Sequence, residues 1–504
     1  MTRRWPAMLR PVRLDSPTAG SMARRGALGT IGVGAQGAVR FITSFLVGRI
    51  GGPAVLGVVQ SAISTALLLS LLWPTTTGGT ASKYVARARG KGDSVEAAAV
   101  AAHLAKRTLQ AALLLAVISL PIWVAIDHGS LAQAASVAAL VLGYSGYSFT
   151  RGLAFGAGQI PRATSWDVLA GTLGLTAMLA ALAAGVRGTV LLLPLAGAYG
   201  LYAAAGWPWH AHSKPARALR RELDGFVALG VLGTLASTGF LQLSMIVVRV
   251  MDGTAHAGQY AAALALATPS SLLAGSLSLV LFPSMAEAWG RGDHEGFRRQ
   301  TDQATRLLVV VMVPLLGALA LCSRLIVSLV WGDRFVESAD LLPVLLLAVL
   351  ATTLGVASVN ALTTSSQQGM LVSSAASVTG LVVGVLAWLV LAPSHGMLGV
   401  AIGYLCGTVV IAAVPVAVVW RRDSHHWSGL GVRLGVGILL AVTLVVIERT
   451  NNTSFLLDPL FAFGFWCGWL AIVPRDTRGA LALIHRPGRG RRPHEPSPPP
   501  RSAG

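Results

Sequence analysis

Charged residues are scarce in this chain of 504 residues, since Asp, Glu, Lys and Arg together make up only 12%. A soluble globular domain carries about 25%, whereas 54% of this sequence is hydrophobic. A chain of this composition has too little polar surface for a water-soluble protein of its size. The composition therefore predicts an integral membrane protein that crosses the bilayer many times.

Cysteine is also scarce. The three cysteines, Cys322, Cys406 and Cys467, all lie in apolar runs, and they offer neither a disulfide framework nor a CxxC or Cys/His metal spacing. A phosphate-cradling GxxxxGK[ST] motif is missing as well, which excludes a built-in ATPase. We accordingly expect no metal, no cofactor and no catalytic residues.

Acidic residues number only 20, against 39 Lys and Arg. From the sequence, all 20 are assigned to loops, tails or the last turns of helices, so we expect no carboxylate in the middle of a span. This absence bears on function, because a carboxylate inside the membrane is the usual binding group for a coupling cation.

Long apolar runs are abundant instead. A helix needs roughly 20 apolar residues to span a bilayer, and fourteen runs approach that length. They fall at 27–48, 54–73, 108–126, 131–150, 166–185, 188–207, 226–250, 259–284, 307–330, 341–361, 372–392, 399–419, 434–448 and 456–473. The sequence thus predicts an all-α polytopic membrane protein of about fourteen helices, with both termini on one side.

The basic residues are unevenly distributed over the predicted connections. If the N-terminus is cytoplasmic, 32 of the 39 Lys and Arg residues fall on that side. Cytoplasmic loops of membrane proteins carry such an excess, so we expect both termini in the cytoplasm. The net charge of +19 is then explained by orientation and by anionic lipid headgroups, and we expect membrane lipids rather than nucleic acid as partners.

Two pairs of similar segments lie two hundred residues apart. The turn "ARGKGD" at 88–93 returns as "AWGRGD" at 288–293, and Arg49 and Arg249 are separated by the same interval. A repeat at this interval indicates an internal duplication. Each copy of the turn follows an even-numbered span, which predicts two six-helix lobes of parallel topology related by a pseudo-twofold axis. Within the turn, we expect Gly to adopt a positive φ and Asp to cap the next helix.

The duplication predicts six segments. They are a basic cytoplasmic N-terminal tail (1–26), an N-lobe of helices 1–6 (27–207), a cytoplasmic linker (208–225), a C-lobe of helices 7–12 (226–419), two additional helices (420–474) and a disordered basic cytoplasmic tail (475–504). The last segment is rich in Pro and Arg, a composition typical of disorder.

Three stretches carry a resemblance to a known family: "FLVGRIGGPAVLGVVQ" (45–60), "GQYAAALALATPSSLLAGSLSLVLFPSMAEAWGRGD" (258–293) and "WGDRFVESADLLPVLLLAVL" (331–350). With the two-lobe organisation, they resemble the multidrug/oligosaccharidyl-lipid/polysaccharide exporter superfamily, and within it the polysaccharide (oligosaccharide) flippases. The resemblance covers about residues 25–420. The lipid II flippase branch is similar in helix number, but its arginine-dense first helix is matched only by Arg40 and Arg49.

The resemblance implies a function. It implies alternating access between two lobes around a central cavity, and a cargo of polyprenyl-pyrophosphate-linked oligosaccharide that moves from the inner to the outer leaflet. The resemblance also implies that the protein lies in the bacterial cytoplasmic membrane. The process it would serve is cell-surface polysaccharide biosynthesis. The implied partners are the lipid-linked sugar and polysaccharide assembly proteins.

The first helix of each predicted lobe carries a polar stripe. In the first lobe, Gln36, Arg40, Thr43 and Ser44 share one helical face. Polar groups within a membrane are costly and tend to face a bundle interior or a wet cavity. Arg suits phosphate oxygens because its planar fork donates two hydrogen bonds. We therefore expect Arg40 to contact a pyrophosphate, with a structural bond to facing carbonyl groups as the alternative.

The seventh helix offers the corresponding stripe, which includes Gln242 and ends at Arg249. Arg49 and Arg249 lie near the outer ends of their helices and are candidates for weaker contacts with the cargo. Their alternative role is anchoring at the interface by snorkelling, with Arg249 paired to Asp252. Asn360 is a candidate sugar contact, as are Gln60 and Trp73, although polar residues at helix ends are commonly solvated.

Two other functions compete with the flippase. A cation-coupled multidrug or metabolite antiporter of the same superfamily generally has a carboxylate within a lobe, which the sequence did not predict here. A membrane-embedded glycosyltransferase or polymerase needs catalytic groups on a sizeable external loop, and the longest predicted outer loops, 331–340 and 449–455, are short. The sequence therefore favours a non-enzymatic transporter of an anionic cargo.

Overall fold

The computed structural model describes residues 22–211, 213–451 and 454–473. These residues form helices joined by short turns, and none of the described residues is in a β-strand. Most of the predicted N-terminal tail (1–21) and the whole predicted C-terminal tail (475–504) lie outside the described residues. Within the described part, the prediction of an all-α protein is confirmed.

The helices follow one another with few intervening residues. Their bounds are α1 Met22–Leu71, α2 Pro74–Gly90, α3 Ser94–Asp127, α4 Leu131–Gly156, α5 Ile160–Ala183, η2 Gly188–Leu192, α6 Leu193–Gly206, α7 Arg217–Thr234, η3 Leu235–Gly239, α8 Phe240–Gly290, α9 His294–Leu321, α10 Ser323–Trp331, η4 Asp333–Phe335, α11 Ser338–Ser365, α12 Gln367–Arg422, α13 Ser428–Thr450, η5 Phe455–Leu457 and α14 Asp458–Ile472.

Three of these helices are too long for a single membrane crossing. In α1, α8 and α12 the backbone leaves the helical conformation at one glycine, at Gly52, Gly253 and Gly396. Ten segments of the described chain are long and apolar enough to cross a membrane, and these glycines divide three of them. Together with the 26-residue α4, this gives fourteen spans in the described residues, as predicted.

The kinks in α1 and α8 are equivalent. Gly52 has φ 79° and ψ −178°, and Gly253 has φ 84° and ψ −171°. Only glycine adopts this combination at little cost, because a Cβ would clash with the backbone. Gly52 and Gly253 lie three and four residues after Arg49 and Arg249, so the second repeat seen in the sequence marks the turn between the first two spans of each lobe.

The turn "ARGKGD" and its copy also have one geometry. Gly92 and Gly292 have φ values of 74° and 73°. Asp93 N donates to Ala88 O and Asp293 N to Ala288 O, both at 3.0 Å, as in a helix C-terminus closed by a left-handed glycine. Asp93 Oδ1 and Asp293 Oδ1 then each cap the next helix. The structural role predicted for this motif is confirmed.

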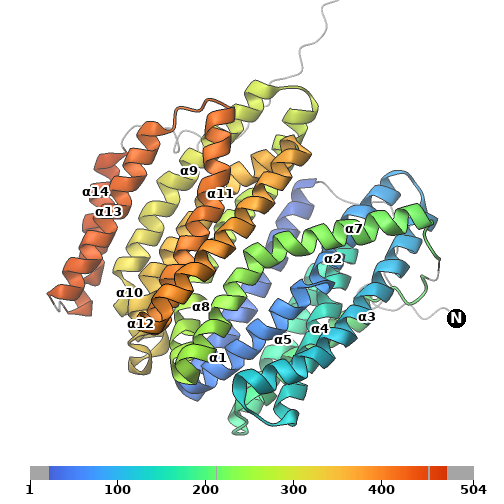
Figure 1. Ribbon diagram of the computed structural model, residues 1–504, viewed down its shortest axis with the longest axis horizontal. Helices are drawn as coiled ribbons and strands as arrows, with labels where there is room; N and C mark the ends of the chain where they lie inside the picture. Colours follow the sequence, from blue (N-terminus) through green and yellow to red (C-terminus); the bar gives the residue numbers. More distant parts are fainter. Residues whose placement is uncertain (1–21, 212, 452–453, 474–504) are drawn as a thin grey trace, which may run out of the picture.

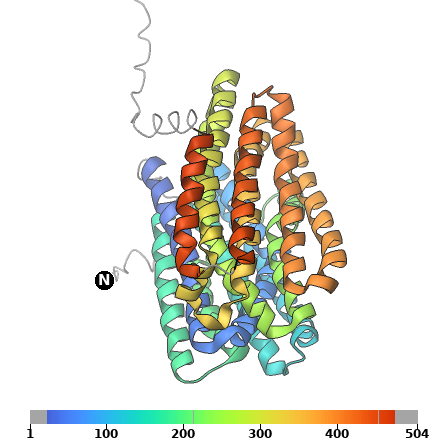
Figure 2. The ribbon, with the colours of Figure 1, turned by 90° about the vertical axis from the view of Figure 1, so that its left-hand side faces the viewer.

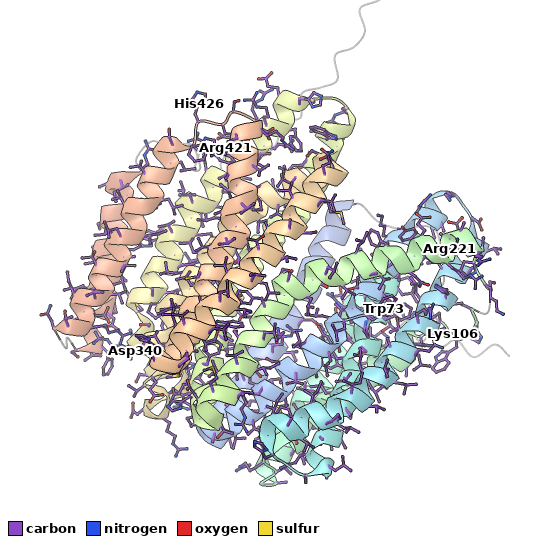
Figure 3. All side chains as sticks on the ribbon, in the orientation of Figure 1. Trp73, Lys106, Arg221, Asp340, Arg421 and His426 are labelled. Carbon is purple, nitrogen blue, oxygen red and sulfur yellow. The ribbon has the colours of Figure 1, made fainter. Side chains whose placement is uncertain are left out.

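The helices are arranged in two groups that diverge from a common end (Figure 1). The N-lobe contains α1 to α6 and the C-lobe contains α8 to α12, and their most extensive contact joins α1 to α8. Figure 2 shows the long helices of both groups running roughly parallel. Lys106, Arg221, Arg421 and His426 lie toward the divergent end, and Asp340 lies at the other (Figure 3). These ends are called the basic end and the opposite end.

Helix α7 belongs to neither lobe alone. It begins at Arg217, within the predicted linker, and its amphipathic first half packs on the N-lobe through the buried Leu223 and Val227. Asp224 anchors it there, 3.0 Å from His103 Nε2 and 3.3 Å from Arg107 Nη2. The helix then crosses to the C-lobe through the π-helical turn η3. The two lobes are therefore joined by a continuous helical segment.

Helices α13 and α14 pack against α9 on the flank of the C-lobe (Figure 2). Arg324 lies 2.8 Å from Glu448 Oε1 and 2.8 Å from Asp458 Oδ1, and both carboxylates are buried. Trp469 Nε1 adds a 3.2 Å bond to Val310 O. Arg324 therefore holds the two additional helices to the C-lobe.

Candidate functional site

A cavity of about 290 Å³ lies between the two lobes. Its N-lobe wall comes from α1, α4 and α6, and its C-lobe wall from α8. On α1 the lining residues lie at 36–44 and 60–67, on both sides of the kink at Gly52. The cavity therefore lies on the basic-end side of the contact between α1 and α8. Among the predicted site residues, Gln36, Arg40, Gln60 and Gln242 line it.

Arg40 is the central cation of this cavity. Its side chain is exposed to the cavity, and its Nη2 donates a 3.3 Å hydrogen bond to the Tyr144 hydroxyl. Tyr144 and Tyr199 form an edge-to-face pair with ring centroids 5.5 Å apart. No carboxylate of the described residues forms an ion pair with Arg40. Its guanidinium therefore has a hydroxyl partner but no counter-charge among the described residues.

Behind Arg40, the N-lobe contains a buried carboxylate. The side chain of Asp167 on α5 is fully buried. Its Oδ2 accepts a 3.0 Å bond from Arg151 Nε, and its Oδ1 accepts bonds from the Tyr147 hydroxyl at 3.0 Å and from Gln36 Nε2 at 3.3 Å. The expectation that all acidic residues lie in loops, tails or last turns was wrong, because α5 begins at Ile160 rather than near 166.

The same shift of boundary affects Arg151. The sequence placed it in a loop, but α4 continues to Gly156, and Arg151 lines the cavity from its last two turns. The signal that was available is that the tyrosines Tyr144 and Tyr147 precede it at helical spacing. Arg40 and Arg151 are the two charged side chains among the cavity-lining residues of the described chain, and both belong to the N-lobe.

The described residues of the C-lobe wall carry no charge. This wall consists of Gln242, Thr268 and apolar side chains of α8 such as Met245 and Leu264. Polar atoms of the walls remain without partners in the described structure: Thr43 Oγ1, Gln60 Oε1 and Arg151 Nη2. Buried polar groups are normally hydrogen-bonded, so this cavity suits water or a polar ligand that offers both donors and acceptors.

Four predicted site residues lie away from the cavity, and Trp73 is one of them, packed against the N-lobe core beside α7. Asn360 on α11 exchanges hydrogen bonds with Ser278 of α8 at 2.8 and 3.1 Å, inside the C-lobe. Arg249 forms an ion pair with Asp127, the last residue of α3, rather than with Asp252. Arg49 lies beside the backbone of Gly332, where an added Cβ would be 2.7 Å from its Nη1.

Arg49 and Arg249 take part in the contact that closes the cavity at the opposite end. Arg49 reaches from the N-lobe to the C-lobe and Arg249 reaches from the C-lobe to the N-lobe. Between them, Gly57 lies against the carbonyl oxygen of Thr254, and Gly258 lies against that of Pro53. A Cβ at either glycine would overlap the facing backbone. The lobes thus meet in a reciprocal contact that repeats the sequence duplication.

The arrangement is a polar, cationic chamber between two lobes, sealed at one end by a small-residue contact and an ion pair. It holds no cluster of three or more His, Cys, Asp or Glu residues suited to a metal ion in the described part of the chain. What it offers chemically is binding of an anion through arginine, beside a group of tyrosines that suits stacking with a sugar face. These features define a membrane protein with a cationic cavity between two lobes.

Comparison with known proteins supports the class of fold. Residues 91–340 match the family model described as "Polysaccharide biosynthesis protein", and no curated protein matches the chain in sequence. The structure is similar to that of the lipid II flippase MurJ in an inward closed conformation, with a TM-score of 0.68 and 12% identity over 90% of this chain and 100% of that chain.

Two further solved structures show the same fold. One is a multidrug resistance MATE family transporter of the MOP superfamily in an inward-facing conformation, with a TM-score of 0.65 and 14% identity over 79% of this chain and 98% of that one. The other is a MOP superfamily transporter from Pyrococcus furiosus, with a TM-score of 0.59 and 16% identity over 82% and 97%. The chain has the same fold as these transporters, which agrees with the fold that the resemblance in the sequence implies.

Proposed function

We propose that the protein is a flippase that moves a polyprenyl-pyrophosphate-linked oligosaccharide from the inner to the outer leaflet of a bacterial cytoplasmic membrane, for cell-surface polysaccharide biosynthesis. The lobes would open the cavity to each side in turn. The family-model match and the similarity to a lipid II flippase support this kind of cargo.

The observation that carries the proposal is the state of Arg40. A charged side chain inside a membrane is expensive, and Arg40 faces the cavity with hydroxyl groups but no described carboxylate as partners. A diphosphate would supply the missing negative charge and enough oxygen atoms for bidentate bonds. The tyrosines beside Arg40 would then receive the first sugars.

The uneven charge supports the direction of transport. Basic loops gather at the divergent end (Figure 3), which would face the cytoplasm by the positive-inside rule. In that orientation the cavity lies on the cytoplasmic side of the closing contact, where the cargo is made. An inside-negative potential contributes about 2.3 kcal/mol per charge per 100 mV, so export of roughly two negative charges would gain about 4–5 kcal/mol without a coupling ion.

A binding experiment tests the proposal. The full-length protein in lipid nanodiscs should bind a polyprenyl pyrophosphate and be stabilised by it against heat, by an amount that grows with ligand concentration. A cationic dye of similar size is the control and should produce no such shift. Stabilisation by the dye alone would exclude an anionic cargo.

A cation-coupled antiporter is the second candidate, and Asp167 is the observation in its favour. It is a buried carboxylate inside a lobe and next to the cavity, where a coupling proton or sodium ion would bind. However, Arg151 Nε already lies 3.0 Å from Asp167 Oδ2, so its charge is neutralised within the protein. Proton- or sodium-dependent dye export that Asp167→Asn abolishes would favour this candidate over the flippase.

A further inference from the structure

The N-lobe wall of the cavity contains a row of side-chain contacts between two antiparallel helices, α1 and α4. Gly32, Gln36 and Arg40 lie four residues apart on one face of α1, and Tyr144, Tyr147 and Arg151 share one face of α4. Arg40 contacts Tyr144, and Gln36 and Tyr147 meet at Asp167. The would-be Cβ of Gly32 lies 3.6 Å from Arg151 Nη2.

Arg40 and Arg151 therefore lie at two depths of one surface. Their levels are separated by eight residues of α1, which is roughly 12 Å at the helical rise per residue. Helical side chains lean toward the N-terminus of their own helix, and α1 and α4 run in opposite directions. The two side chains consequently lean toward each other, Arg151 from the basic end and Arg40 from the closed end.

One nitrogen of the Arg151 guanidinium has no hydrogen-bond partner among the described residues. Its Nε is held by Asp167 Oδ2 at 3.0 Å, and its guanidinium carbon lies 4.9 Å from the ring centroid of Phe155. Its Nη2 is buried without a hydrogen-bond partner among the described residues. A Cβ at Gly32 would lie 3.1 Å from Asp167 Oδ2 and 3.6 Å from Arg151 Nη2, so the glycine lets α1 pack closely over this ion pair. An arginine fixed at one nitrogen and unpaired at another is prepared for a ligand.

We infer that Arg151, positioned by Asp167, is a second anion-binding residue of the cavity, and that with Arg40 it forms a two-arginine site for a diphosphate, carried entirely by the N-lobe. This rests on the proposed function and deepens it. A single phosphate engages one arginine, whereas two arginines at two depths are satisfied together only by an extended anion. The uncharged C-lobe wall moves past a headgroup that stays on the N-lobe.

The site is tested by the preference of the full-length protein for farnesyl pyrophosphate over farnesyl monophosphate, two probes that share one tail. Hydrogen bonds to charged groups contribute about 1.5–3 kcal/mol, so Arg151→Gln should weaken pyrophosphate binding by roughly 10- to 100-fold. Binding of the monophosphate, held by Arg40, should change by about twofold or less. Arg187→Gln removes an arginine of the same lobe outside the cavity and should leave both affinities unchanged.

A double variant distinguishes a role of Arg151 in binding the anion from a role in stabilising the fold. If Arg151 only neutralises Asp167 for folding, Arg151→Gln should lower the melting temperature, and Asp167→Asn added to it should restore both the melting temperature and pyrophosphate binding. If Arg151 binds the anion, the double variant recovers stability but not binding. Asp167→Asn alone should weaken pyrophosphate binding, and it should have no further effect on binding once Arg151 is replaced.

The control outcomes distinguish this inference from the proposed function. If the unaltered protein binds neither farnesyl probe, the proposed function itself fails. If the unaltered protein binds pyrophosphate and Arg40→Gln weakens that binding while Arg151→Gln does not, only the two-arginine site is overturned. Restoration of pyrophosphate binding in the Arg151→Gln, Asp167→Asn variant would likewise overturn it.

Discussion

At the scale of single residues, the ion pair between Arg249 and Asp127 decides how the cavity is closed. Both side chains are only 11% exposed, and they come from different lobes. Breaking a pair that has been desolvated leaves one uncompensated charge, which is far more costly than losing a surface pair. Any movement that separates the lobes at the opposite end must break this pair, and the pair therefore stabilises the conformation seen here.

We predict that Arg249→Ala or Asp127→Ala shifts the protein toward a form open at the opposite end. A coupling free energy of about 1–3 kcal/mol corresponds to a change of about 5- to 150-fold in the populations. Spin labels at Gly129 and Asn451, in a chain whose native cysteines are replaced, should report a longer distance. Exchange of the two residues, Arg249→Asp with Asp127→Arg, should restore the shorter distance. Equal distances in all four proteins would contradict this role.

Arg151 and Asp167 show what residue-level prediction from the sequence missed. The polar stripes of the first and seventh predicted helices identified Gln36, Arg40 and Gln242 as residues that do line the cavity. The sequence predicts too long a gap between the end of the fourth span and the start of the fifth. Hydropathy falls there because both helices carry charged residues, Arg151 and Asp167, within their spans. Polar residues inside a lobe therefore look like a loop, and the most buried carboxylate of the N-lobe was assigned to the end of a helix.

At the scale of elements, the contact between α1 and α8 depends on two glycines. Small residues at helix interfaces allow backbones to approach closely, and Gly57 and Gly258 each lie directly against a carbonyl group of the other lobe. A side chain added at either glycine would meet backbone atoms, which cannot move aside as a flexible side chain could. The closed end is thus set by the backbones themselves, while the ion pair of Arg249 acts at its edge.

We predict that Gly57→Ala and Gly258→Ala each separate α1 from α8 and destabilise this conformation. Overpacking a tight contact costs about 1–3 kcal/mol, so the melting temperature should fall for both. Gly34→Ala is the matched control, because nothing lies within 4 Å of its would-be Cβ on the same helix. A melting temperature for Gly57→Ala equal to that of Gly34→Ala would show that the contact is not tight.

The elements themselves were largely predictable, because fourteen apolar runs and two repeated turns are strong signals in a membrane protein. The path of α7 was not. Its first turns are basic, so the sequence predicts a linker there, yet Leu223 and Val227 share one face and pack on the N-lobe. An amphipathic helix at a membrane surface gives a weak hydropathy signal, so its existence had to come from the structure.

At the scale of the whole molecule, a symmetric scaffold carries an asymmetric cavity. The kinks at Gly52 and Gly253 and the turns at Gly92 and Gly292 repeat each other closely, whereas the charged lining residues of the described cavity come from the N-lobe alone. Duplication supplies the two bodies that alternating access requires. Specialisation of one body would let it retain the cargo while the other changes which end is open.

Topology is the whole-molecule property that we predict most directly. Reporter fusions at Gly92 and Gly292 should be cytoplasmic, because these turns lie at the basic end. Fusions at Gly52 and Asp333 should lie outside. Protease accessibility in right-side-out vesicles provides an independent check. Opposite locations for the two members of either pair would contradict the duplication as well as the orientation.

Transport of a lipid-linked pyrophosphate by Arg40 variants tests the central claim most directly. The protein is reconstituted in vesicles, and a fluorescent polyprenyl-pyrophosphate sugar is followed as it becomes accessible from the other leaflet. The unaltered protein should move it, Arg40→Ala should abolish transport while retaining a normal melting temperature, and Arg40→Lys should recover only part, because an ammonium group lacks the bidentate fork. Near-normal transport by well-folded Arg40→Ala protein would contradict the account.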